Sequence, residues 1–243
     1  MKTLQHFRRL GALDAKLIGR DGLLGGMMLI PLGVALAIRF LFPTILARLG
    51  TAIGIDALRF YPLIASGVLL LITPAVCGIV VGFLLLDQRD ERTLQALAVT
   101  PLSLGRYLAY RLVVPTLLGV PMTIAAFALG GLAQFAPGAV GLAALAAAPI
   151  TPLLALALVS LAENKVQGMA LQKAFSVLLI LPLGGLLAPT PWNWLFGLLP
   201  TTWPLWVLWA WWPASLAALA GGLMYQSLLI VLLYWQFVRR SPV

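Results

Sequence analysis

The charged side chains that could take part in chemistry are concentrated in one short stretch, Asp87-Gln88-Arg89-Asp90-Glu91-Arg92, between long apolar runs. Three of the seven acidic residues of the chain lie in it, within five positions. One charge at the centre of a bilayer costs about 2.5–3.5 kcal/mol on insertion scales, so this stretch must lie in water. The chain shows no serine–histidine pair, metal-ligand set or pair of carboxylates within a span, so we expect recognition of a partner there and no enzymatic activity.

The residues after this stretch have the pattern of a short amphipathic helix that starts near Asp90. Asp90 and Glu91 would lie in its first turn, where the helix dipole favours negative charge. Thr100 precedes a proline and is expected to end the helix. The apolar face would consist of Leu94, Leu97, Ala98 and Pro101. A solvated loop with helical tendency explains the same residues equally well.

The composition decides which elements must position this stretch. Hydrophobic residues make up 62% of the chain and charged residues 9%, which is incompatible with a soluble globular domain of this length. Several continuous runs of about 20 apolar residues can each cross about 30 Å of hydrocarbon. The fold class is therefore predicted as all-α, a polytopic membrane protein made of one domain over residues 1–243.

Six transmembrane helices are expected, after an amphipathic elbow helix at residues 1–21 that lies on the membrane surface. In the elbow, Leu10, Leu13, Leu17 and Ile18 recur at helical spacing among basic residues. Residues 22–189 would form the first five spans, 190–213 the outer interfacial helices and 214–237 the sixth. The predicted spans are 22–42, 62–86, 105–132, 138–161, 169–189 and 214–237.

The lysines and arginines predict the orientation. If the N-terminus is inside, thirteen of the 16 lie on the inner side: in the N-terminal segment, in the even-numbered connections and the span ends beside them, or at the C-terminus. Only Arg39, Arg48 and Arg59 would then lie outside. The positive-inside rule therefore places both termini and the charged stretch in the cytoplasm of a bacterial cell, in a multi-pass protein of the cytoplasmic (inner) membrane. The net charge of +9 is explained by topology and anionic lipid, so no nucleic-acid partner is expected.

Tryptophans mark the other side of the predicted bundle. Seven of the eight fall between Trp192 and Trp212, and prolines interrupt them. Indole rings favour the headgroup level, and frequent prolines disfavour a straight span, so two short interfacial or re-entrant helices are expected before the last span.

Four further residues carry structural expectations. Gly78 and Gly82 have the spacing that permits close helix approach in lipid, and packing within the chain is favoured over a dimer contact. Arg39 is expected to extend toward headgroups rather than to bind a substrate. Cys77 is the only cysteine and excludes an intrachain disulfide.

Residues 86–111, LDQRDERTLQALAVTPLSLGRYLAYR, resemble the first cytoplasmic loop of the membrane subunits of ABC type-2 transporters. Those subunits have an acidic pair, a Thr-Leu, then Thr-Pro-Leu-Ser and a basic-aromatic entry to the third span. Arg92 stands where that family often has glycine. A second cytoplasmic loop, AENKVQGMALQK, and the segment LLPTTWP resemble small drug exporters of the fluoroquinolone-export type. The matching positions in the first loop are Glu91, Thr93, Leu94, Leu97, Thr100, Pro101, Leu102, Ser103, Tyr107 and Arg111.

This resemblance implies partners. A separate ABC ATPase subunit would bind beneath the spans, and a second permease copy or a sister permease would complete the pathway in membrane lipid. ATP and Mg would belong to the ATPase, because this chain has no Gly-x-x-x-x-Gly-Lys-Ser/Thr loop and needs no cofactor of its own. The implied docking residues are Asp90, Glu91, Arg92, Thr93, Leu94, Leu97, Thr100 and Pro101, with Asn164, Lys165 and Gly168 as contacts from the second loop.

The resulting expectation is a membrane subunit of an ATP-driven exporter for a hydrophobic or amphipathic solute. One alternative is a membrane anchor or scaffold that recruits a cytoplasmic protein without transport. Another is a membrane enzyme acting on lipid. An ATPase that co-purifies with the chain favours the exporter, and turnover of a lipid by the isolated chain favours the enzyme.

Overall fold

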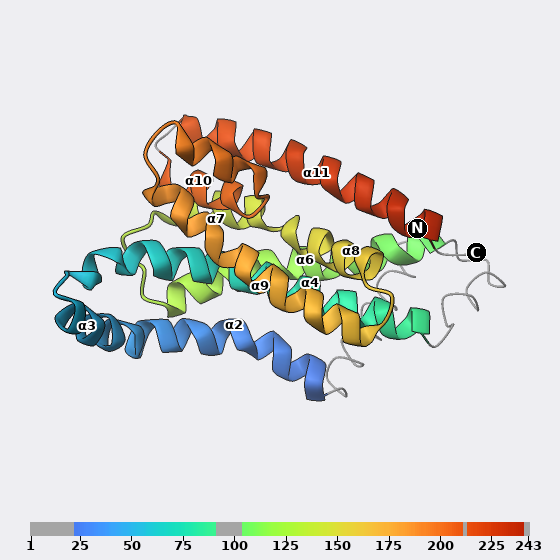
Figure 1. Cartoon of the computed structure of the whole chain (residues 1–243), viewed down its shortest axis with the longest axis horizontal. Coiled ribbons are helices and arrows are strands. Elements are labelled where there is room, and N and C mark those ends of the chain that lie inside the picture. Colours follow the sequence, from blue (N-terminus) through green and yellow to red (C-terminus); the bar gives the residue numbers. More distant parts are fainter. Residues whose placement is uncertain (1–21, 91–103, 211–212, 241–243) are drawn as a thin grey trace.

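The computed structural model describes residues 22–90, 104–210 and 213–240, and within these ranges every regular element is a helix (Figure 1). The all-α class is therefore confirmed. The predicted elbow at residues 1–21 and most of the predicted docking helix, residues 91–103, lie outside the described residues.

Five helical segments in the described part are long and apolar enough to cross a membrane. They are 57–90, 105–129, 137–161, 165–187 and 214–239. A sixth arises if α2 (Gly22–Phe40) and α3 (Phe42–Ile53) are counted as one span, bent by 50° between them. The long helices of the five segments are α4 (Tyr61–Asp90), α6 (Leu104–Leu129), α9 (Lys165–Leu187) and α11 (Ala214–Arg240). The structure is thus a polytopic helical membrane protein.

The predicted fourth span, 138–161, matches the segment 137–161, but this segment contains a break between two helices. α7 (Pro137–Ala147) and α8 (Ile150–Leu161) are separated at Ala148 and Pro149. Pro149 and Pro152 have no amide N–H to donate to the carbonyl groups one turn earlier, so the helical hydrogen-bond ladder is interrupted there. The sequence did not predict this break because the residues on both sides of it are apolar.

Helix α4 is the central helix and packs most extensively against α8. A Cβ atom added at Gly78 would lie 2.6 Å from the Thr151 carbonyl oxygen, and one at Gly82 would lie 3.1 Å from Leu158 Cβ. The two glycines therefore allow α4 and α8 to approach closely, which confirms the prediction of packing within the chain.

The segment between α2 and α4 is largely helical. Pro43 lies in the first turn of α3, where its missing N–H is tolerated, and Gly54 (φ 75°) ends the helix in the left-handed region. A short 3₁₀ helix, η1 (Ala57–Phe60), leads into α4. Arg39 Nη1 donates to the Leu129 carbonyl oxygen at 3.4 Å, so this side chain joins the end of α2 to the end of α6.

Both short helices predicted in the tryptophan-rich segment are present, as η2 (Trp192–Leu198) and α10 (Thr202–Trp209). They differ in burial. Trp194 in η2 is 69% exposed, whereas Leu205 in α10 is fully buried between α7 and α11. The Trp209 indole N–H donates to Ser66 Oγ of α4 at 3.1 Å, which holds α10 inside the bundle.

The bundle has two chemically different ends. At one end lie the start of α2, the end of α4, the start of α6, the α8–α9 turn and the end of α11 (Figure 1). We call it the charged end, since it carries Arg89, Lys165 and Arg239. At the other, the aromatic end, lie α3 and η2. The apolar core forms one cluster toward each end, around Leu69 and Leu205 and around Leu86 and Phe237.

Candidate functional site at the charged end

Three consecutive residues in the last turn of α4 each contact a different helix. Successive residues of an α-helix point about 100° apart, so a helix surrounded by neighbours can reach several of them within one turn. Asp87 reaches the start of α9, Gln88 reaches α6 and Arg89 reaches the end of α8. These contacts hold the end of α4, where the first loop begins, against the end of α8 and the start of α9, which flank the second loop.

Asp87 forms an ion pair with Lys165, with 2.9 Å between Lys165 Nζ and Asp87 Oδ1. The lysine side chain is 55% exposed and the aspartate side chain 38% exposed. An exposed pair of this kind contributes at most about 1 kcal/mol to stability. Its value is therefore positional, because it holds the first residue of α9 beside the end of α4.

Arg89 caps the C-terminus of α8. Its Nη1 donates to the Val159 carbonyl oxygen at 2.9 Å, and its Nη2 donates to the Ala162 carbonyl oxygen at 2.7 Å. The last carbonyl groups of a helix lack partners within the helix and carry partial negative charge. A planar guanidinium carries separate donors on its two terminal nitrogens in a rigid fork, and here each nitrogen satisfies one of the two carbonyl groups.

Gln88 and Tyr107 connect α4 to α6. The Tyr107 hydroxyl donates to Gln88 Oε1 at 2.7 Å. The Arg111 guanidinium lies 5.9 Å from the centre of the Tyr107 ring, within the range of a cation–π contact. The entry to the third span is thus tied to the exit from the second.

The three second-loop residues predicted from the resemblance occupy different environments. Asn164 is the N-cap of α9, and its Oδ1 accepts from the Gln167 backbone N–H at 3.0 Å. Gly168 is buried, and a Cβ added there would lie 2.8 Å from Leu86 Cδ1 of α4. Lys165 is exposed and bound to Asp87. Within this chain, these residues build the loop and seat it on α4.

The predicted first-loop residues are only partly placed. Asp90 is exposed and is the last residue of α4, whereas the sequence put it in the first turn of a separate helix. The helix continues to Asp90 because the preceding residues find partners on neighbouring helices. Glu91, Arg92, Thr93, Leu94, Leu97, Thr100 and Pro101 lie outside the described residues, so their docking role stays a prediction.

Sequence reasoning treated Asp87 to Arg92 as one solvated unit and missed the contacts of Gln88 and Arg89. One signal could have indicated the cap. The predicted fourth span ends at Leu161 and is followed by Ala162 rather than by a glycine, so its last carbonyl groups need donors from elsewhere. Within residues 22–90, 104–210 and 213–240, no group of three or more His, Cys, Asp or Glu side chains could hold a metal ion.

The described residues form a polytopic helical membrane bundle with a cluster of contacts between helices at its charged end, and the comparisons with known proteins give the family. The family model described as Fluoroquinolones export permease protein Rv2686c-like matches residues 14–234, and the chain belongs to this family. It is therefore a permease of an export system.

Two relatives agree with this assignment. They are the Fluoroquinolones export permease proteins Rv2686c, of Mycobacterium tuberculosis (strain ATCC 25618 / H37Rv), and MT2760, of strain CDC 1551 / Oshkosh. Each is 32% identical to this chain over 239 residues, which covers 93% of this chain and 92% of the relative. No solved structure matches the chain.

Proposed function

We propose that this chain is the membrane-spanning subunit of an ATP-driven exporter and that a separate ABC ATPase subunit binds its charged end. The observation that carries the proposal is the set of contacts made by Asp87, Gln88 and Arg89. A force applied to the loop after α4 would be passed directly to α6, α8 and α9. A permease driven by an external ATPase needs such a connection.

The loop itself supplies the predicted docking surface. Leu94, Leu97 and Pro101 would enter an apolar groove on the ATPase, as amphipathic helices do in helix-in-groove contacts. Glu91 and Arg92 would pair with charges at the rim of that groove. ATP and Mg²⁺ would bind to the ATPase, and closure of two ATPases would draw two docking loops together.

The remaining parts of the proposal concern the solute and the assembly. The names of the relatives support a fluoroquinolone or a similar amphipathic solute for this chain as well. We propose one domain over residues 1–243, paired with a second copy or with a sister permease. It would lie in a bacterial cytoplasmic membrane with both termini in the cytoplasm.

The test is recruitment of the ATPase together with ATP-dependent transport in proteoliposomes. Leu97→Asp places a charge on the predicted apolar face and should abolish co-purification of the ATPase or uncouple ATP hydrolysis from transport. Gln95→Asp adds the same charge to the same loop away from that face and should leave both unchanged. Normal export by Leu97→Asp would refute the docking assignment.

A non-transporting scaffold is the other candidate, since an amphipathic loop could recruit any cytoplasmic protein. The same proteoliposomes separate the two. A scaffold would bind its partner without moving ciprofloxacin across the membrane when ATP is supplied.

A further inference from the structure

We propose that the inner half of α9 carries a site for the carboxylate of an amphipathic solute, with Lys173 as the residue that recognises the charge. The site consists of Gln172, Lys173 and Ser176, which we call the polar patch. Lys165, the first residue of α9, lies beside Asp87 at the end of α4. Lys173 follows eight residues later, about 12 Å further along the helix axis. The polar patch therefore lies within the segment of α9 that can cross the membrane.

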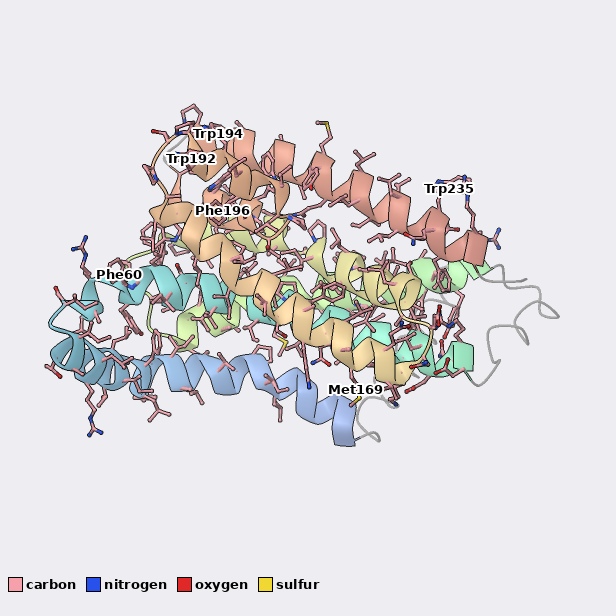
Figure 2. All side chains as sticks on the ribbon, in the orientation of Figure 1. Phe60, Met169, Trp192, Trp194, Phe196 and Trp235 are labelled. Atoms are coloured by element: carbon pink, nitrogen blue, oxygen red, sulfur yellow. The ribbon has the colours of Figure 1, made fainter. Side chains whose placement is uncertain are left out.

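The face of α9 that carries the polar patch is open. Of the five described segments that could span a membrane, α9 and α11 are the least buried. Lys173 and Ser176 are exposed, and Gln172 is half-buried. At 100° per residue the three share an arc of about 100°, and Met169 and Ile180 fall within the same arc. Figure 1 shows α9 at the front of the bundle, and Figure 2 shows Met169 near its start, at the charged end.

The polar patch keeps two hydrogen-bonding groups that the described protein does not use. Ser176 Oγ donates to the Gln172 carbonyl oxygen at 3.0 Å, so this hydroxyl is satisfied. The Gln172 side-chain amide and the Lys173 ammonium have no hydrogen-bond or ion-pair partner among the described residues. No described carboxylate lies within the span beside them. The acidic residues of the described ranges are all at the two ends of the bundle: Asp56, Asp87, Asp90 and Glu163.

Hydrocarbon is a poor environment for this patch. An amide without a partner and a charge are both costly in lipid. The long lysine stem can bring the ammonium of Lys173 back toward the headgroups, but the shorter side chain of Gln172 reaches less far. Polar residues within a span usually face a water-filled cavity or a partner group. The face of α9 around Lys173 is therefore suited to border the path of a solute.

The charge of Lys173 determines which solute fits. An ammonium group without a counter-charge favours an anion, and the Gln172 amide N–H can donate to the second oxygen of a carboxylate. Apolar residues flank the patch on the same face: Met169 is 56% exposed on one side and Ile180 is 67% exposed on the other. An apolar body with one carboxylate matches this arrangement, whereas a neutral solute would leave Lys173 without a counter-charge. The inference rests on the proposed function, because it assumes that a solute passes along α9.

The experiment compares two probes that differ only in charge. Nalidixic acid, an aromatic monocarboxylate, and its neutral carboxamide are dialysed to equilibrium against the full-length chain in phosphatidylcholine nanodiscs, without ATPase or ATP. Lys173→Gln should weaken binding of the acid about tenfold and leave binding of the carboxamide unchanged. Lys173→Arg keeps the charge and should keep the affinity for the acid. Arg239→Gln removes another exposed positive charge at the charged end and should leave both affinities unchanged.

Several results would overturn the site. They are equal binding of the acid to wild type and Lys173→Gln, equal losses in Lys173→Gln and Arg239→Gln, and no binding of the acid to wild type. Phosphatidylglycerol that native mass spectrometry finds on purified wild type but not on Lys173→Gln would assign the patch to lipid headgroups instead. A disulfide between two copies of Lys173→Cys, made in a Cys77→Ser chain, would assign it to a contact between permeases. ATPase recruitment, tested with Leu97→Asp, would stand in each of these cases.

Discussion

The guanidinium of Arg89 donates to the carbonyl oxygen of Ala162 at 2.7 Å, so a side chain of α4 ends α8. Ala162 leaves the helix in an extended conformation (φ −83°, ψ 138°) without the left-handed glycine that often ends helices. Its carbonyl group and that of Val159 are satisfied by the arginine instead. The exits of the second and fourth spans are therefore built as one unit.

Replacing Arg89 should destabilise this unit. Arg89→Gln removes two charge-assisted hydrogen bonds and leaves buried carbonyl groups unpaired, at a cost of about 1–3 kcal/mol. A lower thermal midpoint in detergent would register this loss. Arg48→Gln, at an exposed arginine of α3, is the control and should leave the midpoint unchanged. Arg89→Lys should restore the midpoint only in part, because the lysine side chain is shorter and its donors all lie on one nitrogen instead of in a planar fork.

The Asp87–Lys165 pair should matter more for coupling than for stability. Asp87→Lys and Lys165→Asp should each change stability by less than about 1 kcal/mol. Each should nevertheless reduce ATP-driven transport in proteoliposomes, because the two loops lose their contact. The double variant restores the opposite charges and should recover transport. A double variant as impaired as the singles would show that the pair does not join the loops.

Gly78 should tolerate no side chain. Alanine there would bring its Cβ to 2.6 Å from the Thr151 carbonyl oxygen, so the backbones of α4 and α8 must separate. Such overpacking costs about 1–3 kcal/mol and should lower the thermal midpoint in detergent. Gly119→Ala is the matched control: a Cβ at Gly119 meets nothing within 4 Å, and alanine favours the helix. Equal midpoints for the two variants would contradict the close approach of α4 and α8.

The proposed orientation predicts opposite labelling of the two ends. Val166 is 78% exposed at the charged end and Leu198 is 71% exposed at the aromatic end. A membrane-impermeant maleimide added to intact cells should label Leu198→Cys, and Val166→Cys should react only in inverted vesicles. The native Cys77 is 4% exposed and serves as the unlabelled control. Labelling of Val166→Cys from outside would contradict the proposed orientation and indicate the opposite one.

The long apolar runs allowed the helical class and the approximate position of each span to be predicted from the sequence. Hydrocarbon thickness and backbone hydrogen bonding leave few other choices for such runs. The two short helices around Trp194 and Trp206 also followed, because prolines and indoles mark short, interfacial segments. The burial of α10 did not follow, since composition alone does not tell which apolar faces meet protein and which meet lipid.

The charged end was harder to predict for a different reason. A cluster such as Asp87 to Arg92 reveals that it lies in water, but its contacts depend on which helices surround α4. Arg89 and Ala162 are 73 positions apart in the sequence, so the hydrogen bond between them cannot be inferred from the local spacing of residues. The break at Pro149 was missed because the residues on both sides are equally apolar.

The cap by Arg89 also fixes the register of α4. Each residue inserted into or removed from a helix turns everything beyond it by about 100°. Counting from Gly78, whose position against α8 is set by its close contact, eleven residues bring Arg89 to face the last turn of the same neighbour. Three full helical turns separate the two contacts, so the part of α4 between Gly78 and Arg89 has a fixed length, and an insertion or deletion there would break one of the two contacts.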